Sequence, residues 1–122
     1  MTHILLVDDD ESFRPMLQAT LERFGYEVTA VKNGNEAIER YRQRPADLVI
    51  TDLIMPDKEG VETIRELRGE IPAARIIAMS GGGRNGPNVY LKLATGLGAA
   101  RFLSKPFSHQ ELLDAIAAVL ET

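Results

Sequence analysis

Residues 4–10 read Ile-Leu-Leu-Val-Asp-Asp-Asp, four apolar residues followed directly by three aspartates. An apolar run without a polar face is typical of a strand that is buried on both sides of a sheet. Apolar residues then recur at helical spacing from Phe13 to Phe24 and stop at Gly25, while Pro15 falls in the first turn, where proline is tolerated. The start of the chain therefore predicts a buried strand followed by an amphipathic helix.

The same alternation of a short apolar run and a longer helical pattern continues along the chain. Further strands are predicted at Val28–Val31, Leu48–Thr51, Arg75–Met79 and Ala100–Leu103, and further helices at Asn35–Arg42, Glu59–Arg68, Asn88–Leu97 and Ser108–Leu120. Ser108 and Glu111 form a capping box, which marks the start of the last helix. Five strand–helix units imply right-handed crossovers, so we predict an α/β fold: a single doubly wound domain over residues 1–122, with a five-stranded parallel sheet covered on both faces.

The composition limits the possible functions. With 122 residues the chain has room for one domain, and its 44% hydrophobic residues suffice for a core. A net charge of −4 argues against direct binding to nucleic acid, and the absence of cysteine excludes disulfides, thiolate metal sites and thiol nucleophiles. The run Ile4–Val7 is too short for a signal peptide or a membrane span, so we expect a cytoplasmic protein with no membrane partner.

Polar residues stand at the carboxyl ends of four predicted strands, and these ends meet at one edge of a parallel sheet. They are Asp8, Asp9 and Asp10 after the first strand, Asp52 after the third, Ser80 after the fourth and Lys105 after the fifth. Carboxylates about 4 Å apart repel each other by roughly 4 kcal/mol at an effective dielectric constant of about 20, so clustering them without a cation costs stability. Ligands that are all oxygen favour Mg²⁺, or else Mn²⁺, over zinc, which prefers His or Cys.

Each of these residues alone has an ordinary structural explanation, because an aspartate after a strand is commonly a helix cap and Lys-Pro is commonly a surface turn. Together, Ser80 and Lys105 supply a hydroxyl and a positive charge that would bind the oxygens of a phosphoryl group beside the cation. His3 and His109 are expected at the opposite end of a strand and at a helix start, so they are given no metal role. The edge is therefore predicted to hold a phosphoryl group on a carboxylate.

The chain resembles the CheY-like receiver domains of two-component response regulators from end to end. The matching segments are Ile4–Asp10, Asp52–Pro56 with Gly60, Met79–Gly81 and Phe102–Phe107, in the family's order and nearly its spacing. The resemblance implies the flavodoxin-like strand order 2-1-3-4-5. It also implies a phosphorylation-dependent signalling switch that catalyses only its own phosphorylation and dephosphorylation, not an enzyme that acts on other molecules.

The resemblance assigns a role to each residue of the acidic edge. Asp52 is similar to the residue that accepts the phosphoryl group in this family. The same residue is also similar to one of the family's Mg²⁺ ligands. Asp9 resembles the direct ligand, Asp8 its water-mediated companion, and the backbone carbonyl of Ile54 a third protein ligand. Asp10 is expected to face solvent or to cap the first helix.

The remaining motif residues resemble the parts of the switch. Ser80 is similar to the hydroxyl that moves toward the phosphoryl group, Lys105 to its ion-pair partner, and Phe102 to the aromatic side chain that follows the movement. The family also implies a cis peptide bond between Lys105 and Pro106. The changed surface would be that of the fourth helix, fifth strand and fifth helix.

The partners implied by the resemblance are proteins. The phosphoryl donor would be a sensor histidine kinase, a phosphotransfer protein or a small phosphodonor. The output would be a downstream protein target or a covalently linked output domain, and no output domain is expected within residues 1–122. The chain is thus expected to be a stand-alone adaptor or relay protein, or the receiver of a longer regulator.

One stretch departs from the family pattern. Between Ser80 and Lys105 lie 24 residues, about three more than is usual, and the excess falls in Gly81–Pro87. Its glycines have the spacing of a phosphate-binding loop, but Pro87 and Asn88 stand where Lys and Ser or Thr are required. A flavodoxin-like cofactor site is disfavoured because only 6% of the residues are aromatic and, without a metal ion, the acidic edge would repel a phosphate.

Two alternatives stay open at this point. A pseudo-receiver would act through protein contacts alone, without phosphorylation, although the full set of site residues is present. A haloacid-dehalogenase-type phosphatase would use Asp8 as its nucleophile, because Asp8-Asp9-Asp10 also fits an Asp-x-Asp signature. That family places an acidic pair after the lysine, whereas only the isolated Glu111 and Asp114 follow Lys105 in the last helix.

Overall fold

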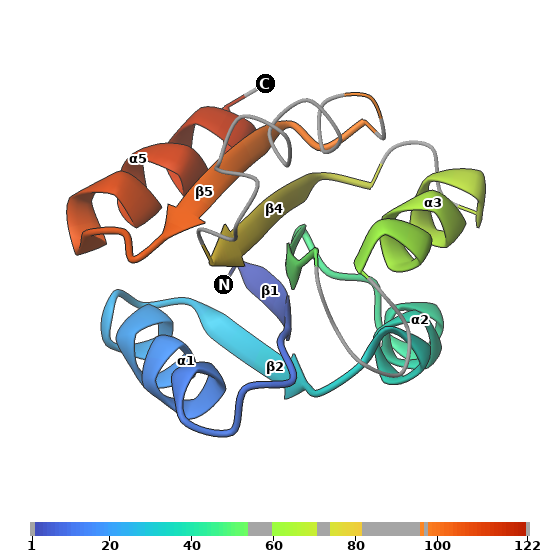
Figure 1. Ribbon diagram of the computed structural model, residues 1–122, viewed down its shortest axis with the longest axis horizontal. Helices are drawn as coiled ribbons and strands as arrows, with labels where there is room; N and C mark the ends of the chain where they lie inside the picture. Colours follow the sequence, from blue (N-terminus) through green and yellow to red (C-terminus); the bar gives the residue numbers. More distant parts are fainter. Residues whose placement is uncertain (1, 54–59, 71–73, 82–95, 97, 122) are drawn as a thin grey trace.

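The computed structural model describes residues 2–53, 60–70, 74–81, 96 and 98–121 (Figure 1). Its strands are β1 (His3–Val7), β2 (Glu27–Val31), β3 (Leu48–Asp52), β4 (Ile76–Gly81) and β5 (Arg101–Lys105). The helices in these residues are α1 (Phe13–Arg23), α2 (Gly34–Gln43), α3 (Gly60–Glu70) and α5 (His109–Leu120). The predicted alternation is confirmed, with bounds that differ by two residues at most.

The five strands form one parallel sheet in the order β2-β1-β3-β4-β5, as predicted. Val7 lies opposite Val31 in β2 and Thr51 in β3, and Ser80 of β4 lies opposite Ser104 of β5. This register aligns the carboxyl ends of the strands at one edge. The order reverses between β1 and β3, which is where ligands bind in open α/β sheets.

Helices cover both faces of the sheet, α1 and α5 on one and α2 and α3 on the other (Figure 1). Successive residues of β1 face opposite layers: Leu5 and Val7 pack toward α2 and α3, whereas Ile4 and Leu6 pack toward α1 and α5. All four are buried. Burial on both faces explains why β1 is an uninterrupted apolar run.

Helix ends follow local chemistry. In α5 the predicted capping box is confirmed, because Ser108 Oγ accepts from the Glu111 amide at 3.0 Å and Glu111 Oε1 accepts from the Ser108 amide at 3.2 Å. Asn33 caps α2 through the amide of Glu36. Gly25 has φ = 92°, the left-handed conformation that ends α1 and leads into β2.

Two predictions lie outside the described residues, wholly or in large part. They are the helix at Asn88–Leu97 and the glycine-rich segment after Gly81, which is itself the last residue of β4. No helix in the described part of the chain is long and apolar enough to cross a membrane.

Candidate functional site

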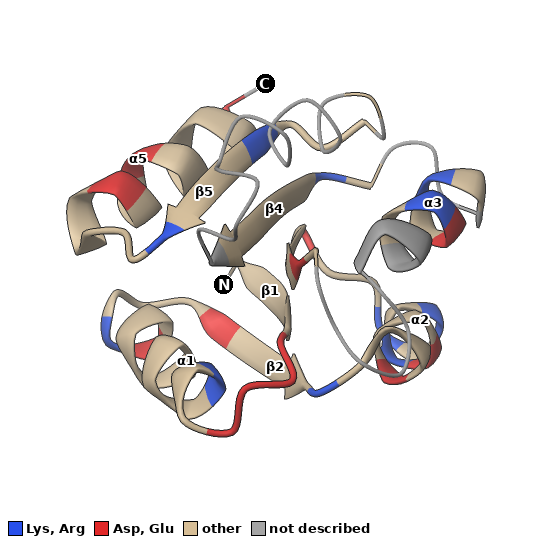
Figure 2. Cartoon of the chain, viewed as in Figure 1, with Lys and Arg blue, Asp and Glu red and all other residues tan. Residues whose placement is uncertain are grey.

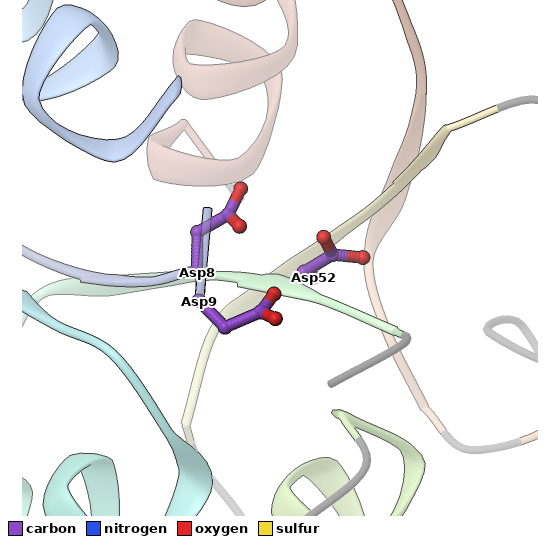
Figure 3. A group of neighbouring side chains, drawn as sticks. All are labelled: Asp8, Asp9 and Asp52. Carbon is purple, nitrogen blue, oxygen red and sulfur yellow. The ribbon is translucent and has the colours of Figure 1, made fainter. Parts of the chain in front are cut away.

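Three carboxylates gather at the carboxyl edge of the sheet. Asp8 and Asp9 directly follow β1, and Asp52 is the last residue of β3, so adjacent strands place them side by side (Figure 3). One oxygen from each lies within 4.8 Å of the other two. Asp8 is completely buried and Asp52 is 7% exposed, whereas Asp9 is partly open to solvent. The structure therefore brings together three of the four aspartates that the sequence placed at this edge.

Lys105 brings the positive charge to the same point. At the end of β5, its Nζ donates to Asp8 Oδ2 at 2.8 Å and to Asp52 Oδ2 at 3.0 Å. Burial alone lowers the pKa of Lys105, but the hydrogen bonds and negative charges of Asp8 and Asp52 outweigh it and raise the pKa above its usual value. The side chain is thus a fixed cation between two carboxylates.

Asp8 is held by further contacts on both sides of its backbone. Its Oδ1 accepts from the Asp10 amide at 2.9 Å, and its own amide donates to the Val31 carbonyl at 3.1 Å. The Arg14 guanidinium donates to the Asp8 carbonyl at 2.8 Å and also pairs with Glu11. Both carboxylate oxygens of Asp8 are therefore engaged, which disfavours it as the nucleophile that a phosphatase would require.

Asp10 takes no part in the cluster. Its side chain is exposed, and its Oδ1 accepts from the amides of Ser12 at 2.8 Å and Phe13 at 2.9 Å at the start of α1. These two backbone hydrogen bonds lower the pKa of Asp10. Ser12, the residue that precedes α1, makes no side-chain cap. The acidic segment after β1 (Figure 2) thus divides into a site pair, Asp8 and Asp9, and a helix cap.

The other predicted residues lie on β4, on and just after β5, or outside the described residues. Ser80 is buried near the end of β4. Phe102, in β5, is half-buried against the core layer of α2 and α3. The Lys105–Pro106 peptide bond is cis. Ile54, expected to supply a backbone carbonyl, lies outside the described residues.

The charges of this edge suit a divalent cation. Asp8, Asp9 and Asp52 offer carboxylate oxygens, the donors preferred by Mg²⁺, and Lys105 bonds to the carboxylates of Asp8 and Asp52. Three carboxylates lie close together here, and like charges at such distances repel each other, so a divalent cation would relieve the repulsion. The donor set therefore fits Mg²⁺, with Asp8, Asp9 and Asp52 as the described residues that could hold it.

Sequence reasoning placed Phe13 only in the apolar pattern of α1, yet its ring lies next to the site. Lys105 Nζ lies 4.2 Å from the centroid of the Phe13 ring. The Phe107 ring meets the same ring edge-to-face, with centroids 6.0 Å apart and planes at 85°. The sequence feature that could have indicated this contact is an aromatic residue in the first turn of the helix that follows Asp8, Asp9 and Asp10.

Comparisons with known proteins agree with this geometry. Residues 4–117 match the family described as the response regulator receiver domain. The chain therefore belongs to the receiver domains of two-component response regulators. Phosphorylation and Mg²⁺ binding at an acidic pocket are typical of this family.

Individual relatives and solved structures support the same conclusion. The chemotaxis protein CheY of Bacillus subtilis is 35% identical over 98% of this chain and 99% of its own length. The alkaline phosphatase synthesis transcriptional regulatory protein PhoP of the same species is 33% identical over 96% of this chain, but the chain spans only 48% of PhoP. The structure of Vibrio cholerae chemotaxis protein CheY4 superposes with a TM-score of 0.88, at 30% identity, covering 98% of this chain and 99% of CheY4.

Proposed function

We propose that this receiver domain accepts a phosphoryl group on Asp52 in a Mg²⁺-dependent reaction and signals through the resulting change of its surface. The observation that carries this proposal is the position of Lys105, whose ammonium bonds to both Asp8 and Asp52 within a cluster of three carboxylates. A structural ion pair would need one carboxylate for one ammonium. The surplus of carboxylates suits a site that receives a cation and a phosphoryl group.

The chemistry follows from the residues that surround Asp52. An ionised carboxylate needs no general base, so an oxygen of Asp52 forms the bond to phosphorus directly. The bond between phosphorus and the donor's nitrogen or oxygen breaks, and the leaving group departs with its electron pair. Lys105, within 3.0 Å of Asp52, is placed to pair with an oxygen of the transferred group.

Asp8, Asp9 and Asp52 would hold the metal ion, together with the Ile54 carbonyl that the sequence motif adds. When bound, Mg²⁺ supplies positive charge that stabilises the phosphoryl oxygens. Asp9 is the open member of the cluster and would bind it directly, whereas Asp8 already bonds to Lys105 and to the Asp10 amide. This division of roles agrees with a water-mediated contact from Asp8.

The signal would pass through Ser80 and Phe102. Ser80 is buried at the strand end beside Asp52, and Phe102 lies on the neighbouring strand β5. Movement of the Ser80 hydroxyl toward the phosphoryl group would let the Phe102 ring turn further inward, biasing an existing equilibrium of the β5 and α5 surface. The fourth helix is expected to belong to this surface.

The partners follow from the same proposal. The phosphoryl donor is a sensor histidine kinase, a phosphotransfer protein or a small phosphodonor. The phosphorylated domain is recognised by a protein target or a linked output domain in the cytoplasm. CheY of Bacillus subtilis is matched over its full length and PhoP over half, so the proposal covers both a stand-alone relay and one part of a longer regulator. No direct contact with nucleic acid or membrane by residues 1–122 is needed, and these residues act on no substrate other than the domain itself.

The test is incubation with acetyl phosphate and Mg²⁺, followed by intact-mass spectrometry. The wild type should gain one phosphoryl group, and Asp52→Asn should gain none. Asp10→Asn is the matched control, because Asp10 caps α1 and stays outside the cluster. Equal labelling of Asp52→Asn would overturn the assignment, and no labelling of the wild type by acetyl phosphate or a phosphorylated histidine kinase would favour a pseudo-receiver.

A further inference from the structure

Two phenylalanines at opposite ends of α1 make the same kind of ring contact. Phe13 meets Phe107 edge-to-face at 6.0 Å and 85°, and Phe24 meets His109 edge-to-face at 5.8 Å and 83°. Only the Phe13 ring also has an ammonium over its face among the described residues, with Lys105 Nζ 4.2 Å from its centroid. Phe24 therefore provides an internal reference for ring packing alone.

The Lys105 ammonium has two kinds of partner. Asp8 and Asp52 attract it by charge, at 2.8 Å and 3.0 Å, and the face of Phe13 attracts it through the ring quadrupole. Its side chain is only 16% exposed, and cation–π attraction is stronger where the cation has lost water. The Phe107 contact restrains the orientation of the ring that receives the ammonium.

The two kinds of partner differ in what else they bind. Both carboxylates belong to the proposed metal and phosphoryl site, so their bonds to Lys105 compete with the ligands of that site. The Phe13 ring is not a ligand for the metal ion or the phosphoryl group, so its contact with Lys105 does not compete with them. A lysine held only by carboxylates would lose its position whenever those carboxylates are engaged.

From this geometry we infer that Phe13 is a positioning residue, whose ring face keeps the Lys105 ammonium at the edge of the site for the phosphoryl oxygens. This inference rests on the proposed phosphorylation of Asp52. The simpler explanation is that Phe13 only fills space beside α5, and it is half-buried against that core layer. The two explanations differ in whether the electron density of the ring matters.

The experiment compares variants that separate ring volume from ring charge. Phe13→Leu keeps an apolar side chain without a π face, and 3,4,5-trifluorophenylalanine at position 13 keeps the ring while withdrawing electron density from its face. Phe24→Leu is the matched control, because it removes an edge-to-face contact of α1 that involves no ammonium. Each protein is tested for its rate of labelling by acetyl phosphate at saturating Mg²⁺ and for its Mg²⁺ affinity.

We expect about a fivefold slower labelling in Phe13→Leu, equivalent to ~1 kcal/mol at 1.36 kcal/mol per factor of ten, and a smaller loss with trifluorophenylalanine. Mg²⁺ affinity should stay within about twofold, and Phe24→Leu should label at the wild-type rate. In a Lys105→Met background, Phe13→Leu should cause no further loss, because the ring acts through the lysine. Wild-type rates for both position-13 variants, or an equal loss in the Lys105→Met background, would show that the ring only packs.

A second readout does not depend on phosphorylation. In the unmodified protein, the methylene protons beside Lys105 Nζ should show an upfield ring-current shift in NMR spectra that disappears in Phe13→Leu and persists in Phe24→Leu. If the wild type takes up no phosphoryl group but this shift is present, the proposed function fails while the Phe13–Lys105 contact stands. Absence of the shift in the wild type would overturn the inference itself.

Discussion

The amino and carboxyl ends of the parallel strands form two edges of the sheet, and these edges differ in how their charged and polar side chains are paired. At the amino edge the polar contacts are one to one: the His3 amide donates to Asp47, His3 Nε2 lies 2.8 Å from Thr29 Oγ1, and Arg44 pairs with Glu27. The buried His3 Nδ1 has no hydrogen-bond partner among the described residues. At the carboxyl edge, Asp8, Asp9 and Asp52 cluster together, and Lys105 bonds to two of them, Asp8 and Asp52. The one-to-one contacts of the amino edge suit a structural role, whereas the clustered carboxylates of the other edge suit the proposed ligand site.

Solvent exposure reinforces this contrast. The Arg44 and Glu27 side chains are 58% and 39% exposed, so water screens their attraction and removing one of them costs little. Asp8 and Asp52 are largely buried, where uncompensated charge is expensive. We therefore expect the clustered carboxylates to lower the stability of the metal-free protein, and the following predictions test the difference between the two edges in order of decreasing effect.

Metal affinity should separate neighbouring aspartates. Asp9→Asn should weaken Mg²⁺ binding by at least about tenfold, because Asp9 is the open carboxylate of the cluster. Asp10→Asn should change it by less than about twofold, and Asp8→Asn should be intermediate. Calorimetric titration measures all three, and equal losses in Asp9→Asn and Asp10→Asn would contradict the division seen in the structure.

Stability without metal should change in opposite directions at the two edges. Removing the charge of Asp9 relieves its repulsion with Asp8 and Asp52, so Asp9→Asn should stabilise the metal-free protein by about 1 kcal/mol, or roughly 4 °C in Tm. Glu27→Gln removes one partner of a matched pair and should not raise Tm. Thermal unfolding in the presence of a chelator would decide this, and a lower Tm for Asp9→Asn would show that the cluster is not under electrostatic strain.

The response to a phosphoryl mimic should be confined to one edge. With beryllofluoride and Mg²⁺, hydrogen exchange should change around Phe102 and in the expected fourth helix, and much less at the amino edge or in α1. Ser80→Ala should still bind the mimic but show a smaller difference, because the hydroxyl that couples the site to β5 is missing. An undiminished difference in Ser80→Ala would place the coupling elsewhere.

The smallest effect concerns acid at the amino edge. The hydrogen bond from Arg44 lowers the pKa of Glu27 below its usual 4.5. The contribution of this pair is therefore fully present above about pH 4.5 and is lost as the pH falls through the lower pKa of the folded state. The Tm difference between wild type and Glu27→Gln should be constant near neutral pH and shrink toward pH 3. A difference that grows in acid would have the wrong sign.

Local patterns were sufficient for the strands and helices that the structure describes, whereas the strand order came from the family resemblance. The period of apolar residues predicted the strands and helices, and Ser108 with Glu111 predicted the start of α5, because strand burial, helix periodicity and capping depend on residues within a few positions of each other. The parallel arrangement then placed Asp8, Asp9 and Asp52 at one edge without any knowledge of side-chain positions.

The details of the site required the folded chain. The three aspartates after β1 have identical side chains, so their different roles were predicted from the family resemblance alone. The backbone path into α1 directs Asp10 to the Ser12 and Phe13 amides. Lys105 reaches Asp8 and Asp52 across 97 and 53 positions of sequence, and the Phe13 ring meets that ammonium from another element. Such contacts depend on how α1, β1, β3 and β5 pack together, so their distances belong to the tertiary structure and not to any local stretch of sequence.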